Sequence, residues 1–134
     1  MRVIVKAVLY FIGIMALLVA GYIGYLTLTY IDETVVEGEA YGFKVGATKH
    51  QAFSDIKSML NRQPKLVVYI DYGPRAGDNM TIEPVDSSFP TAAKFDSWWL
   101  LLDGKGEFFN IIRLRFNNQV LAEIHRHRQY FELP

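Results

Sequence analysis

The chain contains no cysteine and carries no net charge. The absence of cysteine among 134 residues excludes disulfide bonds, thiol chemistry and lipid attachment at a cysteine. Lys plus Arg and Asp plus Glu are both 14, and this zero balance argues against nucleic acid as a partner. The sequence also lacks the H-E-x-x-H, G-x-S-x-G and phosphate-loop patterns, and no spacing forces two carboxylates together. We therefore expect no enzyme activity and no cofactor.

What the sequence does have is one long apolar run without a charged side chain, from Ala7 to Ile31. At about 1.5 Å per residue, a helix of this length covers about 37 Å, which exceeds the roughly 30 Å hydrocarbon core of a bilayer. We predict a transmembrane signal-anchor helix at residues 7–31, after a short cytoplasmic N-terminus at 1–6. A juxtamembrane linker at 32–44 and an extracytoplasmic domain at 45–134 are expected to follow.

The charges that flank the apolar run predict its orientation. Arg2 and Lys6 precede it, whereas four acidic residues follow it at positions 32, 33, 37 and 39. Lys and Arg close to a membrane segment remain on the cytoplasmic side, so the N-terminus is expected inside and the rest of the chain outside.

A cleaved signal peptide is the alternative reading of the same run, with Val19-Ala20-Gly21 as small residues before a cut at Tyr22. The apolar run continues past Gly21 to Ile31, and cleavage would leave an apolar new terminus. We therefore favour the uncleaved anchor.

Four small residues share one face of this predicted helix, namely Gly13, Ala16, Ala20 and Gly24. Small residues at this spacing allow a second membrane helix to approach closely, so these four are candidates for helix packing. The alternative is that membrane helices are simply rich in Gly and Ala.

The rest of the chain predicts an α+β domain. Thr48 and Gln51 form a capping box before an amphipathic helix, whose apolar residues recur at 52, 53, 56, 59 and 60. Strands are expected at Leu66–Ile70, 95–102, 107–116 and 120–128, giving one helix on an antiparallel sheet of three or four strands. The segment Gly73–Lys94, with three prolines, is expected to be a long functional or disordered loop with an optional short strand at 81–83.

Two hairpins are expected to connect the last three strands. Asp103-Gly104 is a typical tight-turn dipeptide between the first two of them. For the last hairpin we predict a three-residue loop at 117–119. This register places Phe116 opposite Val120 and Arg113 opposite Glu123, which keeps the apolar side chains on one face.

Two stretches are similar to the SmpA/OmlA (BamE-like) family of small bacterial envelope proteins. Val45-Gly46-Ala47-Thr48 through Phe53 resembles the V-G-M-T turn of that family, and Ile112 to Leu121 resembles its strand, F-N turn and return strand. The resemblance implies an α+β scaffold or accessory subunit, and with the predicted anchor it places the chain in the bacterial inner membrane with a periplasmic domain. The chain departs from the family in lacking the acylated Cys.

Candidate site residues come from the strands. Glu123, His125 and His127 alternate, so they project from one face of the last strand and are weak metal-ligand candidates, with solvated or paired His as the alternative. Trp98 and Trp99 are adjacent and cannot both point to one side of a sheet. Aromatic and Arg side chains are frequent anchors of protein interfaces, which makes five residues candidates for partner binding: Trp99, Arg113, Arg115, Arg126 and Arg128.

The leading functional hypothesis is a membrane-anchored, extracytoplasmic protein-interaction module that acts as a scaffold or accessory subunit of a bacterial envelope complex. The first alternative is a toxin-neutralising immunity or inhibitor protein at the inner membrane. The second is a metal-dependent enzyme built around the two histidines.

Overall fold

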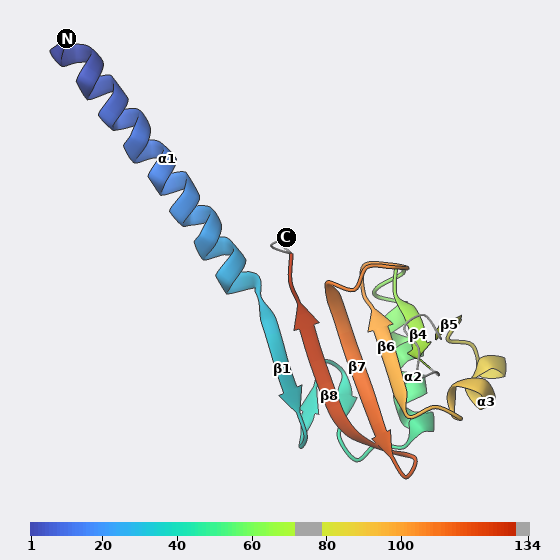
Figure 1. Ribbon diagram of the computed structural model, residues 1–134. Helices are drawn as coiled ribbons and strands as arrows, with labels where there is room; N and C mark the ends of the chain where they lie inside the picture. The colour runs from blue at the N-terminus through green and yellow to red at the C-terminus, as the bar shows by residue number, and fades with distance from the viewer. Residues whose placement is uncertain (72–78, 131–134) are drawn as a thin grey trace. The chain divides into compact units, whose positions relative to one another are not determined.

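The computed structural model describes residues 1–71 and 79–130 (Figure 1). The chain divides into two units, of which one contains the N-terminal helix and the other spans Ile31–Arg128. Each unit is described by itself.

Helix α1 spans Arg2–Thr29. Between Val3 and Thr29 it is long and apolar enough to cross a membrane, a test that a signal sequence also passes. The hydroxyl groups of Thr27 and Thr29 donate to the carbonyl oxygens of Ile23 and Tyr25, at 2.6 and 2.8 Å. These bonds satisfy polar side chains within the helix itself, as an apolar environment requires.

The second unit is built on a six-stranded antiparallel sheet with the strand order β1-β8-β7-β6-β4-β5 (Figure 1). The strands are β1 (Ile31–Val35), β4 (Val67–Asp71), β5 (Asn79–Ile82), β6 (Ser97–Leu101), β7 (Asn110–Asn117) and β8 (Val120–Arg128). Strands β2 (Glu39–Ala40) and β3 (Phe43–Lys44) form a separate small hairpin. The α+β class is therefore confirmed, but the predicted sheet of three or four strands was too small.

Both additional strands come from segments that were read as connections. Residues 32–44, expected as a linker, contain most of β1, which pairs with β8 from Ile31↔Arg128 to Val35↔Ile124. The Gly73–Lys94 segment contains β5, a 3-10 turn at Asp86–Ser88 and the short helix α3 (Phe89–Ala92). Its positions 73–78 lie outside the described residues. The optional short strand at 81–83 overlaps β5, whereas β1 was not predicted, because this exposed edge strand carries a weak apolar pattern.

Helix α2 spans Lys49–Leu60 and begins as predicted. Thr48 is its N-cap, and the Thr48 hydroxyl accepts a hydrogen bond from the backbone N–H of Gln51 at 3.2 Å. The apolar positions Ala52, Phe53, Ile56 and Met59 are all buried, which confirms the predicted amphipathic face.

The core lies between α2 and one face of the sheet. Alternate residues of the central strands supply it, including Val68 and Ile70 of β4, Trp98 and Leu100 of β6, and Ile112 and Leu114 of β7. Each of these six side chains is at most 2% exposed, so the centre of this face is fully buried.

The β7–β8 hairpin corrects the predicted register. Its turn has two residues, Asn118 and Gln119, with φ angles of 50° and 68°, and not the three that we expected. Phe116 therefore pairs with Leu121, and a β-bulge follows, so that Arg115 pairs with Glu123 and Arg113 with His125. The bulge inserts one extra residue in β8, which lets Leu121 and Ile124 both face the core despite the shorter turn.

The β6–β7 connection also differs from the expected tight turn. Strand β6 ends at Leu101 and β7 begins at Asn110, so Asp103 and Gly104 belong to a longer loop at 102–109. The loop is closed at its base by the backbone N–H of Leu102, which donates to the carbonyl oxygen of Asn110 at 3.0 Å.

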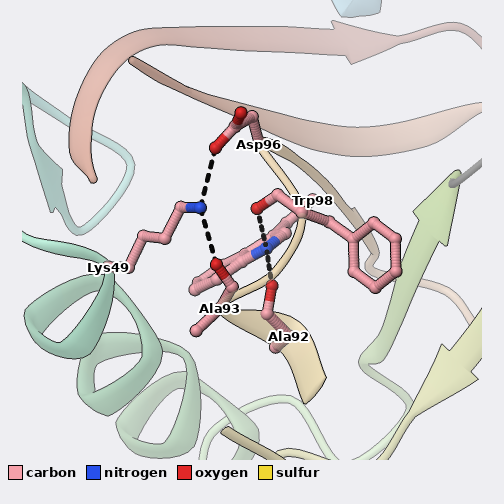
Figure 2. A network of polar contacts seen from close by, with 6 residues as sticks. Lys49, Ala92, Ala93, Asp96 and Trp98 are labelled. Carbon is pink, nitrogen blue, oxygen red and sulfur yellow. Dashed lines mark hydrogen bonds and ion pairs between the residues drawn. The ribbon is translucent and has the colours of Figure 1, made fainter. Parts of the chain in front are cut away.

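The start of α2 is fastened to the sheet at two places. Gly46 and Ala47 exchange backbone hydrogen bonds with Leu121 of β8, at 2.7 and 2.8 Å. The buried Lys49 ammonium group donates to Asp96 Oδ1 at 2.7 Å and to the Ala93 carbonyl oxygen at 2.8 Å (Figure 2). The helix is thus tied to β8 and to the segment that enters β6.

Candidate interaction surface

The face of the sheet opposite α2 gathers most of the residues that were expected to bind a partner. We call it the outer face and define it by eight side chains that alternate with the core positions: Asp32, Tyr69, Trp99, Arg113, Arg115, Glu123, His125 and His127. They come from β1, β4, β6, β7 and β8, and within the described part of the Ile31–Arg128 unit no helix packs on this face.

The two adjacent tryptophans separate as the strand geometry requires. Trp98 is fully buried in the core, where its indole N–H donates to the Ala92 carbonyl oxygen at 3.0 Å (Figure 2). Trp99 lies on the outer face and is only half-buried. The Arg113 guanidinium lies over the Trp99 ring, 5.5 Å from its centroid. A cation over an indole face is attracted by the ring quadrupole, so this pair is held in a defined geometry.

Two further aromatic side chains enlarge the apolar part of this surface. Phe108, from the β6–β7 loop, packs edge-on against Tyr69 at 5.4 Å and against Trp99 at 6.4 Å between ring centroids. Phe108 itself is 41% exposed. An aromatic patch with one strongly exposed ring therefore adjoins the Arg113–Trp99 stack.

The charged part of the outer face is centred on Glu123. Its carboxylate lies 3.3 Å from Arg115 Nη1 and 3.7 Å from Arg113 Nη2. Arg113 was predicted to lie directly opposite Glu123. In the structure Arg115 lies directly opposite Glu123, and Arg113 approaches the carboxylate only diagonally. Two guanidinium groups share one carboxylate, which leaves this part of the surface with a net positive charge.

Strand β1 brings a partner to His125 that the sequence did not indicate. His125 Nε2 lies 2.7 Å from Asp32 Oδ1, across the β1–β8 pair. Glu123 is engaged by the two arginines, so the three proposed metal ligands do not converge. Among the described residues, no group of three or more His, Cys, Asp or Glu side chains could hold a metal ion.

Two polar atoms of the outer face are buried without a hydrogen-bond partner among the described residues: Arg113 Nε and His125 Nδ1. Arg113 and His125 are direct partners across β7 and β8, so the two atoms belong to neighbouring side chains.

Arg126 is a correction to the predicted partner-binding set. It alternates with His125 and His127, so it points to the α2 side of the sheet and is only 6% exposed. There it donates to the carbonyl oxygens of Ile111 and His127, at 2.9 and 2.7 Å, and to the side-chain oxygen of Asn110. Arg128 lies on the same side as Arg126 and lines the same pocket, so neither residue belongs to the outer face.

The small residues of α1 line a shallow apolar groove of about 490 Å³, at Ala16 and Ala20. Gly13 and Gly24 have no neighbouring atoms within 4 Å of a Cβ built on them. The predicted role of this face in helix packing stays a prediction.

Sequence reasoning missed two residues of the outer face, Asp32 and Tyr69, and also Phe108, which packs against it. Tyr69 could have been found, because it alternates with Val68 and Ile70 in a predicted strand. Asp32 and Phe108 could not have been found. Asp32 lies on an edge strand that was not predicted, and Phe108 is brought to this surface by the fold of the β6–β7 loop.

Comparisons with protein-family models, curated proteins and solved structures yield no match. The similarity to the SmpA/OmlA (BamE-like) family therefore stays a prediction from the residues that carry it.

Proposed function

We propose that this chain is a single-pass, membrane-anchored protein-interaction module whose outer face binds a partner protein. The observation that carries the proposal is the Arg113–Trp99 stack, which presents a cation over a large aromatic ring on a face that no described helix of the Ile31–Arg128 unit covers. Trp and Arg, together with Tyr, are the residues that dominate binding energy at protein interfaces.

The chemistry of the outer face specifies the kind of partner surface. Arg113 and Arg115 share Glu123 as their carboxylate, so the charged part favours an acidic segment. The adjoining aromatic patch of Trp99, Phe108 and Tyr69 favours apolar side chains next to that segment. The matching surface is thus acidic on one side and apolar on the other.

The N-terminal helix indicates the membrane setting of the domain. Helix α1 acts as an uncleaved anchor with its N-terminus in the cytoplasm, because Arg2 and Lys6 precede the apolar run and acidic residues follow it. Together with the family resemblance, this orientation supports a periplasmic domain that serves as a scaffold or accessory subunit of an envelope complex.

Site-specific photo-crosslinking in native membranes tests this proposal. A photoreactive amino acid at Phe108 should crosslink to a partner, because this ring is exposed beside the Arg113–Trp99 stack. The matched control is Ser58, which is exposed on α2, on the opposite side of the sheet. Equal crosslinking at Phe108 and Ser58 would contradict the outer face as the binding surface.

A pair of charge variants tests the same surface independently. Arg113→Ala with Arg115→Ala should lose the crosslinked partner while the domain stays folded, as checked by circular dichroism. Arg62→Ala with Lys105→Ala removes the same charge from exposed positions elsewhere and should retain the partner. His125→Ala with His127→Ala should reduce crosslinking less than the arginine pair does, because neither histidine belongs to the Arg113–Trp99 stack. Loss of the partner only in the His variant, together with loss of a bound metal, would favour the metal hypothesis instead.

A further inference from the structure

The connection between the N-terminal helix and the sheet is very short. Only Tyr30 separates the end of α1 at Thr29 from the start of β1 at Ile31. Consecutive Cα atoms are about 3.8 Å apart, so Ile31 stays within about 8 Å of Thr29 whatever angle the two units adopt. An anchor that ends at Thr29 therefore keeps the first residue of β1 close to the surface of the bilayer.

The pairing of the strands brings a second segment to the end of the sheet where β1 begins. Ile31 pairs with Arg128 of β8, and Arg128 pairs on its other side with Asn110, the first residue of β7. The β6–β7 loop at 102–109 therefore leaves the sheet at this end, and we call it the anchor-end loop. Strand β7 is two strand spacings from β1, about 10 Å, so the loop is within reach of the same bilayer surface.

The anchor-end loop presents two neighbouring aromatic rings to solvent. Phe108 and Phe109 are 41% and 38% exposed, and no other Phe, Tyr or Trp in the described part of the Ile31–Arg128 unit is so exposed. Phe108 packs against Tyr69 and Trp99, which holds the loop on the sheet and leaves little entropy to lose on binding. Apolar aromatic rings are favoured at the boundary between lipid headgroups and acyl chains.

The charges of the loop do not favour an electrostatic attachment. Asp103, Lys105 and Glu107 are all exposed in it, so the signs are mixed. Burial of aromatic surface is then the main source of affinity. We propose that the anchor-end loop inserts Phe109, with Phe108 beside it, into the headgroup region of the bilayer that α1 spans. This contact holds the domain against the membrane at a defined tilt.

The inference rests on the proposed membrane anchor and not on the partner-binding outer face. The bilayer is the occupant that the observations favour, because the exposed rings lie at the end of the sheet that the short connection ties to the membrane.

The test uses the full chain in phosphatidylcholine vesicles whose lipids are brominated near the headgroup. The chain has no cysteine, so one introduced cysteine carries a fluorescent label at a single position. Glu107→Cys places the label in the anchor-end loop, and Asn117→Cys places it at the other end of β7, about 24 Å away. We expect strong quenching at 107 and none at 117. Equal quenching at both positions, or none at 107, would overturn the proposal.

A third label separates failure of this inference from failure of the anchor. Leu18 lies within the apolar part of α1, so a label in Leu18→Cys should be quenched by lipids brominated deep in the acyl chain. Quenching at 18 without quenching at 107 overturns the membrane contact of the domain alone. Absence of quenching at 18 overturns the anchor, and the membrane contact with it.

Two matched variants of the Glu107-labelled chain test the role of Phe109. Phe109→Ser removes a side chain that is 38% exposed, and Val120→Ser removes one that is 39% exposed at the other end of the sheet. The first should abolish most of the quenching at 107 and the second should leave it unchanged. Quenching should also persist in high salt, because insertion of a ring is not electrostatic. Unchanged quenching in Phe109→Ser, or its loss in high salt, would overturn the proposal.

Discussion

The ammonium nitrogen of Lys49 lies 2.7 Å from Asp96 Oδ1, and its side chain is 3% exposed whereas that of Asp96 is 68% exposed. Lys49 also lies 5.6 Å from the centroid of the Phe116 ring. The buried cation therefore joins the first turn of α2, the entry to β6 and the end of β7. A lysine in the first turn is unfavourable for the helix dipole, so a tertiary contact explains its position.

Removal of the Asp96 carboxylate tests this contact. Asp96→Ala leaves the Lys49 ammonium buried with the Ala93 carbonyl as its remaining neutral acceptor. We expect a loss of about 1–2 kcal/mol in the free energy of unfolding, the low end for a charged hydrogen bond because Asp96 is largely exposed. Chemical denaturation measures it. In a Lys49→Met background the same Asp96→Ala change should cost almost nothing; equal costs in both backgrounds would show that the two residues are not coupled.

The β7–β8 turn carries a residue that is strained in the native chain. Gln119 has a φ of 68°, in the left-handed region, and follows Asn118 at 50°. A two-residue turn of this kind favours Asn-Gly, so Gln119→Gly should stabilise the domain by about 0.5–1 kcal/mol. Thermal unfolding checks the gain. Gln119→Ala is the control, because alanine keeps the Cβ that causes the strain, and a similar gain in that variant would contradict the explanation.

Tyr41 predicts an alkaline pH dependence. Its phenol donates to the Glu33 carboxylate, and this hydrogen bond, with burial and the Glu33 charge, raises the pKa of Tyr41 above its usual 10.0. A pKa that is higher in the folded state stabilises the fold below pH 10, and this contribution is lost as the pH rises through the folded-state pKa. Tyr41→Phe should therefore flatten the fall in stability above pH 10, as measured by denaturation between pH 9 and 11. The ultraviolet difference titration of the two proteins should place the Tyr41 transition above 10; a transition at or below 10 would contradict the assignment.

The anchor is tested by its orientation and its mass. A periplasmic-type reporter fused after Pro134 should be active outside the cytoplasm, because Arg2 and Lys6 are predicted to keep the N-terminus inside. The membrane fraction should contain the chain at its unprocessed mass. A mature N-terminus at Tyr22 would instead establish a cleaved signal peptide.

The two segments that carry the family resemblance lie next to each other in the fold. The residues that carry it, Val45–Phe53 and Ile112–Leu121, lie in the α2 start and the β7–β8 hairpin, which are joined by the bonds between Gly46–Ala47 and Leu121. The sequence similarity therefore falls on two segments that pack together, although neither segment reveals this by itself.

The sequence alone determined the features that depend on local pattern. An uncharged apolar run is a long helix because its backbone groups have no other way to be satisfied in an apolar environment. Thr48, Gln51 and the apolar repeat after them determined α2. A high β-branched and aromatic content determined β4, and period-two alternation determined β7 and β8. Alternation also required Trp98 and Trp99 to lie on opposite faces, whereas the shared face of Trp99, Arg113 and Arg115 follows from the register between β6 and β7.

Only the tertiary structure decided the features that depend on contacts distant in sequence. Strand β1 exists because β8 offers an unpaired edge, and Asp32 reaches His125 for the same reason. A bulge allowed a two-residue turn to keep both Leu121 and Ile124 in the core, a solution that regular alternation does not reveal. The tertiary structure also decided that Arg126 is buried and does not lie on the predicted binding surface. Two backbone carbonyl oxygens and the Asn110 side chain accept its hydrogen bonds, and these offset the cost of burying a guanidinium.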